Sequence, residues 1–158
     1  MNSAWRGCLL ASMVLLSNVT AALADTPAIF KQLAGSWRGS GDLTLSDGTR
    51  DRISCRGYYR LTGNGMSLAI LCDSPNYKIE IRSDLVGGGN GISGHWEERT
   101  FNANGELSGR AFDNRMRLSI TGYINGSMSV SLSGRRQSVS ISAQGTGFKS
   151  VSMTLVPG

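Results

Sequence analysis

The sequence predicts an all-β protein, an antiparallel up-and-down meander of about 8–10 short strands that closes into a barrel. From Trp37 onward, apolar residues recur at every second position, which is the period of a half-buried strand. Turn sequences such as Asp47-Gly48, Asn104-Gly105 and Asn125-Gly126 separate the alternating segments. Because each segment has one apolar and one polar face, the sheet must close on itself or pack on a second sheet. A two-sheet sandwich is therefore the alternative.

Residues 1–24 read as a secretory signal peptide. Arg6 supplies the positive charge, residues 8–16 form a short apolar core, and Ala22-Leu23-Ala24 matches a small-x-small cleavage site. The apolar run is shorter than the about 20 residues that a spanning helix needs. We therefore expect an exported protein, periplasmic or extracellular, in which residues 25–158 form a single barrel domain and Cys8 is removed with the signal.

One short helix is expected before the first strand. Thr26 is a good N-cap, Pro27 suits the first helical position, and Gly35 predicts the end of the helix. So short a helix is marginal alone, so it should cover one end of the barrel. The residues expected to build that end are Ile29, Leu33, Gly35 and Trp37.

Residues 52–73 contain both cysteines of the expected mature chain and predict a β-hairpin around the two-residue turn Gly63-Asn64. Counting pairs outward from this turn places Cys55 opposite Cys72, at a rung where facing side chains lie closest. Export provides an oxidising compartment, so we predict a structural disulfide worth about 3 kcal/mol. A metal site is not expected, because His95 is the only histidine and no CxxC motif is present.

The alternation continues to the C-terminus, where the polar face of the last strands is almost pure serine. These serines are Ser127, Ser129, Ser131, Ser133, Ser138, Ser140, Ser142, Ser150 and Ser152. We expect the last strand, near residues 151–155, to pair with the first strand, near residues 37–45, and so to close the barrel.

The segment Gly35-Ser36-Trp37, which follows the helical turn and opens the first strand, resembles the G-x-W signature of lipocalins and the wider calycin barrels. Its extended form over residues 35–41 is similar to the opening of nitrobindin-like domains. The resemblance implies a calycin-like barrel with the tryptophan packed across its closed end. Nitrobindin-like domains bind haem through a late histidine, and this chain has no histidine after His95. Haem binding is therefore not carried over, and no cofactor is expected.

Glycines alternate with large side chains on the inward face, at positions such as Gly39 and Gly109. In one interpretation they leave space for a small ligand; in the other they let coiled strands bend while neighbours fill the gap. The candidate pocket residues are Trp96, Glu98, Tyr59, Tyr77, Gly94 and Gly122. Glu98 points inward by alternation, but its place at a strand end favours a solvated carboxylate at the barrel rim.

Arg52, Arg56, Tyr58 and Arg60 form an outward face on the cysteine hairpin, with residue types that are common at protein interfaces. Without Arg6, 15 basic residues stand against 11 acidic ones, and they are dispersed. Nucleic-acid binding favours a clustered basic stripe, so it is not expected. Aromatic residues make up 7% and form no girdle, which argues against a membrane-spanning barrel.

No nucleophile motif accompanies the many serines, so we do not expect an enzyme. The sequence therefore favours an exported, non-enzymatic barrel that binds a small apolar or amphipathic ligand. The alternative is a solid barrel that acts as an envelope or protein-interaction module through its Arg/Tyr hairpin face.

Overall fold

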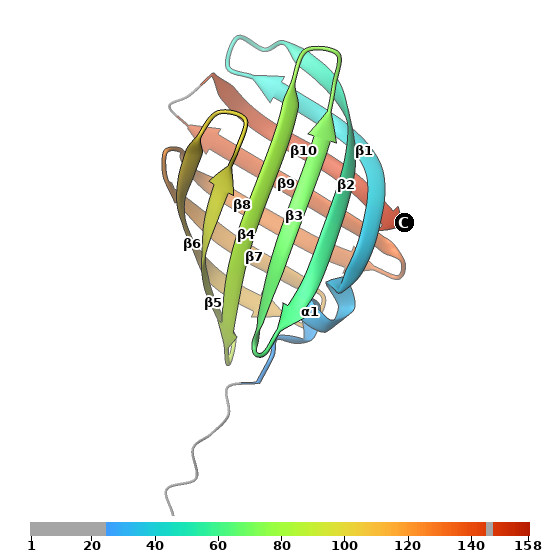
Figure 1. Ribbon diagram of the computed structural model, residues 1–158, viewed down its shortest axis with the longest axis vertical. Coiled ribbons are helices and arrows are strands. Elements are labelled where there is room, and N and C mark those ends of the chain that lie inside the picture. Colours follow the sequence, from blue (N-terminus) through green and yellow to red (C-terminus); the bar gives the residue numbers. More distant parts are fainter. Residues whose placement is uncertain (1–24, 145–146) are drawn as a thin grey trace, which may run out of the picture.

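The computed structural model describes residues 25–144 and 147–158, and in this part of the chain ten strands form a closed antiparallel barrel with a short helix at one end (Figure 1). The predicted signal peptide, residues 1–24 with Cys8, lies outside the described residues. Among the described residues, no helix has the length and apolar character needed to cross a membrane.

Each strand pairs with its neighbour in sequence, and the first pairs with the last. The strands are β1 (Gly35–Leu45), β2 (Arg50–Thr62), β3 (Gly65–Asp73), β4 (Lys78–Gly88), β5 (Gly91–Glu98), β6 (Ala103–Phe112), β7 (Arg115–Gly122), β8 (Asn125–Ser133), β9 (Arg136–Gln144) and β10 (Phe148–Pro157). The β1–β10 ladder runs from the Trp37–Pro157 pair to Leu45 and Phe148. The predicted meander and its closure are confirmed, and the sandwich alternative is excluded.

The alternation in sequence becomes an inside and an outside. Inward residues along each strand are buried and form one continuous core, whereas the residues between them face solvent. β9 shows this clearly, because Val139 and Ile141 are buried and Ser138 and Ser140 are exposed. The serine-rich face of the last strands therefore lies on the outside of the barrel.

Helix α1 (Ala28–Leu33) covers one end of the barrel, which we call the covered end (lower end in Figure 1). Its residues Ile29, Phe30 and Leu33 are fully buried against the core. The indole nitrogen of Trp37 donates a 2.7 Å hydrogen bond to the carbonyl oxygen of Leu33. This bond satisfies a carbonyl in the last turn of the helix, where carbonyls lack an intrahelical partner.

The predicted N-cap is wrong by one residue. Pro27 occupies the N-cap position without a side-chain hydrogen bond, and helix α1 begins at Ala28. The hydroxyl of Thr26 instead donates a 3.1 Å hydrogen bond to the carbonyl oxygen of Gly63, in the β2–β3 turn. The sequence predicts that this hydroxyl caps the helix, but in the structure it bonds to the distant Gly63. Thr26 therefore ties the segment before the helix to the barrel.

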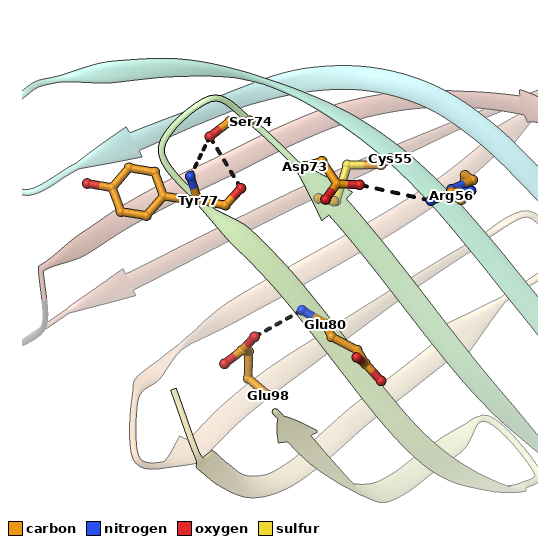
Figure 2. Close-up of a disulfide and its surroundings, with 8 residues drawn as sticks. Cys55, Arg56, Asp73, Ser74, Tyr77, Glu80 and Glu98 are labelled. Atoms are coloured by element: carbon orange, nitrogen blue, oxygen red, sulfur yellow. Dashed lines mark hydrogen bonds and ion pairs between the residues drawn. A yellow bond between two sulfur atoms is a disulfide. The ribbon is translucent and has the colours of Figure 1, made fainter. Parts of the chain in front are cut away.

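The cysteine hairpin has the predicted register. The turn at residues 63–64 joins β2 to β3, and Cys55 pairs with Cys72 across the two strands. The two residues form a disulfide with Cα atoms 4.1 Å apart, buried on the inward face (Figure 2). On the far side of β3, Cys72 lies opposite Ile79 of β4.

Candidate functional site

The end of the barrel opposite α1, which we call the open end, holds apolar side chains that point inward but remain half-buried. The β1–β2, β3–β4, β7–β8 and β9–β10 connections all lie at this end (Figure 1). Seven apolar residues there pack against the core without being fully covered, and we call them the apolar mouth: Leu45, Tyr77, Ile79, Ile81, Ile124, Met128 and Phe148.

The β3–β4 loop holds Tyr77 in place at the mouth. The hydroxyl oxygen of Ser74 accepts a 2.9 Å hydrogen bond from the backbone nitrogen of Tyr77 (Figure 2). The Ser74 nitrogen donates to the Tyr77 carbonyl at 2.8 Å. The side chain of Asn76 donates to the carboxylate of Asp51 on β2 at 3.0 Å. The loop is thus tied to β2, and the backbone of Tyr77 is held at the mouth.

Glu98 is buried rather than solvated, with 7% of its surface exposed. One carboxylate oxygen accepts a 2.9 Å hydrogen bond from the backbone nitrogen of Glu80 (Figure 2). The other accepts one of 2.6 Å from the backbone nitrogen of Phe101. These two amides compensate the cost of taking the carboxylate out of water. Glu98 therefore joins β4 to the β5–β6 loop at the open end.

Trp96 is also buried, and its indole nitrogen donates a 3.3 Å hydrogen bond to the carbonyl oxygen of Thr121. The ring lies over Gly105 on β6, where an added Cβ would come within 2.8 Å of the indole nitrogen. Trp96 thus connects β5 to β7 across β6. Gly105 belongs to this packing although sequence reasoning did not single it out.

The inward glycines do not line a cavity. A Cβ at Gly39, Gly41, Gly94 or Gly109 would lie within 2.3 Å of a carbonyl oxygen on the adjacent strand. At Gly122, where φ is +117°, the carbonyl oxygen of Asn104 would be 2.6 Å away. At these five positions neighbouring backbone fills the space, as expected where strands approach closely, and at Gly57 the ring of Tyr59 would lie 3.0 Å from an added Cβ.

Tyr59 lies apart from the other candidate pocket residues. It pairs with Gly35, next to helix α1, so it belongs to the covered end. Its hydroxyl oxygen accepts a 2.7 Å hydrogen bond from the side-chain nitrogen of the fully buried Gln137. Burial raises the pKa of Tyr59 to about 12, and the bond from Gln137 opposes that rise.

Gln137 is the polar residue of the interior that sequence reasoning missed. Its side-chain oxygen has no hydrogen-bond partner among the described residues. A signal was present, because Gln137 stands at an inward position of the β9 alternation that continues with Val139 and Ile141. A polar residue at an apolar position indicates a buried partner, which here is Tyr59.

The Arg/Tyr face of β2 points outward, as the alternation predicts. The guanidinium of Arg52 donates to the hydroxyl of Ser40 at 3.2 Å, and that of Arg56 lies 4.0 Å from the carboxylate of Asp73. Tyr58 is 47% exposed, and Arg60 is exposed beyond it. These residues share one side of the strand; Arg52 lies toward the open end of the barrel, whereas Tyr58 and Arg60 lie toward the covered end.

The described residues contain no group of three or more histidine, cysteine or carboxylate side chains that could hold a metal ion. His95 points outward and lies 3.2 Å from the carboxylate of Glu106. Two hollows occur on the outer face. One, of about 440 Å³, lies over β1, β2, β8, β9 and β10, and the other, of about 250 Å³, lies at the β6–β7 turn.

No protein-family model matches the chain, and no curated protein matches it. Among solved structures, the barrel is similar to the crystal structure of Rv2717c from M. tuberculosis. The TM-score is 0.71 at 12% sequence identity, over 85% of this chain and 99% of that one. At this identity the similarity shows the fold alone. The resemblance to calycin barrels is therefore supported as far as a closed antiparallel barrel, and no further.

Proposed function

We propose that this protein is an exported, non-enzymatic β-barrel that binds a small apolar or amphipathic ligand at its apolar mouth. The observation that carries the proposal is the contrast in burial between the two ends. Helix α1 covers the inward apolar residues at one end, whereas the seven residues of the mouth remain half-buried at the other. Apolar surface that no other segment covers is typical of binding sites.

The ligand would lie across the rim rather than deep in the barrel. Neighbouring atoms occupy the space beside the inward glycines, and Trp96 packs onto Gly105. The half-buried side chains of Ile79, Ile81 and Met128 supply the apolar contact surface. The phenol of Tyr77 adds one polar group there, which fits an amphipathic ligand.

Two features support export into an aqueous compartment. The Cys55–Cys72 disulfide is consistent with an oxidising environment. The outward face is dominated by serine, threonine and charged residues, whereas a barrel that crosses a membrane presents an apolar band to lipid. Both features support a barrel that is surrounded by water.

A matched pair of variants on β4 tests the proposal. Ile79 is half-buried at the mouth, whereas Val86 on the same strand is 53% exposed on the outer side. We expect the parent protein to bind the neutral fluorophore N-phenyl-1-naphthylamine saturably. Ile79→Glu should weaken this binding about tenfold or more, because a carboxylate resists burial against an apolar ligand. Val86→Glu should bind like the parent.

Absence of saturable binding by the folded parent would refute the proposal. Equal weakening by the two variants would also refute it, since the effect would then follow net charge rather than the mouth. Melting temperatures of both variants show whether each remains folded during the titration.

The Arg/Tyr face of β2 supports a second candidate, an envelope or protein-interaction module. Its specific support is an exposed cluster in which Tyr58 is 47% and Val156 of β10 is 43% exposed. Val156 pairs with Arg38, which pairs with Arg56. Aromatic and arginine side chains together are typical interface anchors. Arg56→Ser/Arg60→Ser should abolish association with a partner if this face binds one.

A further inference from the structure

Charge is distributed unevenly around the barrel. Asp113 is the last acidic residue in the sequence, so every charged side chain in residues 114–158 is basic. This part of the chain forms β7, β8, β9 and β10. The basic residues are Arg115, Arg117, Arg135, Arg136 and Lys149. One side of the outer surface therefore carries cations without carboxylates on the same strands.

At the border of this side, two arginines on β6 and β7 face each other directly. Arg110 on β6 pairs with Arg117 on β7, and neither forms an ion pair with another described residue. Elsewhere on the surface, Arg82 lies 2.9 Å from the carboxylate of Glu80. Like charges directly opposite on adjacent strands destabilise a sheet, so an anion bound between these arginines would relieve their repulsion. Because neither arginine has an ion-pair partner among the described residues, the pair presents two uncompensated guanidinium groups to solvent.

These arginines continue into a row of hydroxyl groups. Strand register places one outward residue from each of seven adjacent strands in a single cross-strand row, which we call the Arg–Ser row: Arg52, Asp42, Ser152, Ser140, Ser129, Arg117 and Arg110. The next row has the same character, with Thr154, Ser138, Ser131 and Arg115 on successive strands from β10 to β7.

The Arg–Ser row crosses both hollows of the outer face. The larger, of about 440 Å³, is lined by Ser129, Ser140 and Ser152 and reaches Asp42 and Arg52. The smaller is lined by Arg115 and Arg117, with Phe112, Asp113 and Asn114 from the β6–β7 turn. Since Arg117 pairs with Ser129, the two hollows adjoin. Together they form a trough across the strands, lined mainly by hydroxyl groups at one end and by arginines with Phe112 at the other.

The two ends of the trough differ in charge. Asp42 is the one carboxylate in the Arg–Ser row, and it pairs with Arg52 on β2. The charge is therefore balanced at that end and unbalanced at the Arg110–Arg117 end. Asp113 lies at the turn beside Arg115, where it offsets part of the positive charge without forming an ion pair among the described residues.

We propose that this trough binds an acidic polysaccharide. Guanidinium groups hydrogen-bond carboxylates in a fork geometry, and rows of serine hydroxyls both donate to and accept from sugar hydroxyls. Strands lie about 4.8 Å apart, so successive serines of the row can follow an extended chain of sugar rings. An extended polymer fits a trough that crosses strands, and its acidic groups fit the unpaired arginines.

Other polyanions fit less well. Single-stranded nucleic acid binds by stacking its bases on several aromatic side chains. Among the described residues that line the two hollows, Phe112 of the smaller one is the single aromatic residue. A membrane surface favours apolar and aromatic side chains that insert among lipids. The serine lining offers neither a set of aromatic side chains for stacking nor apolar side chains for insertion. Single-stranded DNA and lipid vesicles therefore serve as the comparison probes in the test.

The test measures binding of the intact exported protein to fluorescently labelled polygalacturonate, with neutral dextran as the uncharged comparison. The parent should bind polygalacturonate at least about tenfold more tightly than dextran, and raising the salt concentration from about 0.05 to 0.5 M should weaken that binding. Arg110→Ser/Arg117→Ser should weaken it about five- to tenfold. Ser140→Glu, which places a carboxylate in the middle of the row, should weaken it by a similar factor.

Arg56→Ser/Arg60→Ser is the matched control, because it removes the same charge from β2 and leaves the trough unchanged. It should bind within about twofold of the parent. The proposal is overturned if the two double variants lose equal affinity, or if the Arg110/Arg117 variant binds like the parent. It is also overturned if single-stranded DNA or phosphatidylglycerol vesicles bind as tightly as polygalacturonate.

Discussion

The covered end and the open end are built by the same sequence pattern and differ in what lies over them. At the covered end, Ile29, Phe30 and Leu33 of helix α1 are fully buried. On β4, Leu85 is buried toward the covered end, whereas Ile79 and Ile81, at inward positions of the same strand toward the open end, remain half-buried. Alternation thus decides which face of a strand points inward. How deeply a residue is buried depends on whether another segment covers it.

The largest expected effect concerns Trp37. It is buried and hydrogen-bonded to the last turn of α1, so Trp37→Ala should lower the free energy of unfolding by about 3–5 kcal/mol. Tyr77→Ala at the open end should cost clearly less, because that ring is only half-buried. Denaturant unfolding of both variants measures the difference. Equal losses would show that the two ends contribute alike.

The disulfide gives the next effect. Cys55 and Cys72 join β2 to β3, and Cys72 lies opposite Ile79 of the mouth. Replacing both cysteines with alanine should lower the free energy of unfolding by about 3 kcal/mol. The measurement is equilibrium unfolding of the double variant beside the oxidised parent. An unchanged midpoint would show that the strand ladder alone holds this hairpin.

Glu98 tests whether buried hydrogen bonds hold the open end. Glu98→Gln keeps the size of the side chain but replaces one amide-accepting oxygen with a donor that faces a backbone N–H. The expected loss is about 1–3 kcal/mol, the cost of a buried group without its partner. Amide hydrogen exchange at Glu80 and Phe101 should accelerate in the variant. Unchanged exchange at both positions would show that the carboxylate holds neither amide.

The smallest effect at neutral pH belongs to Tyr59 at the covered end. Its pKa rises from 10.0 to about 12 in the folded protein, so folding favours the protonated phenol. The resulting stability is complete below pH 10 and is lost as the pH rises toward about 12. Thermal unfolding across this range should show the decline, and Tyr59→Phe should remove this contribution. A parent and a variant with equal alkaline declines would contradict the assignment.

The fold could be predicted because its signals are local. A two-residue turn determines the register of the cysteine hairpin, so counting from Gly63-Asn64 placed Cys55 opposite Cys72, as the structure has it. Closure followed from the polar and apolar faces, since an open sheet of this length would expose both edges.

The interior polar contacts could not be predicted, because their partners are distant in sequence or lie in loops. Glu98 is buried because the backbone nitrogen of Phe101 turns back toward it, and alternation does not describe loop amides. Gln137 finds Tyr59 across the barrel, 78 residues away. The glycine positions had two open interpretations, and only the approach of neighbouring backbone decides between them.

The pairing of β1 with β10 has a kinetic consequence. Nine of the ten ladders join strands that are neighbours in sequence, whereas this ladder joins residues 37–45 to residues 148–157. Local hairpins form early, and contacts across the whole chain form late. Until β10 is complete, the partly folded chain presents two unpaired strand edges, which are templates for association with other chains. Ring closure is therefore the step at which the folding chain stops being prone to aggregation.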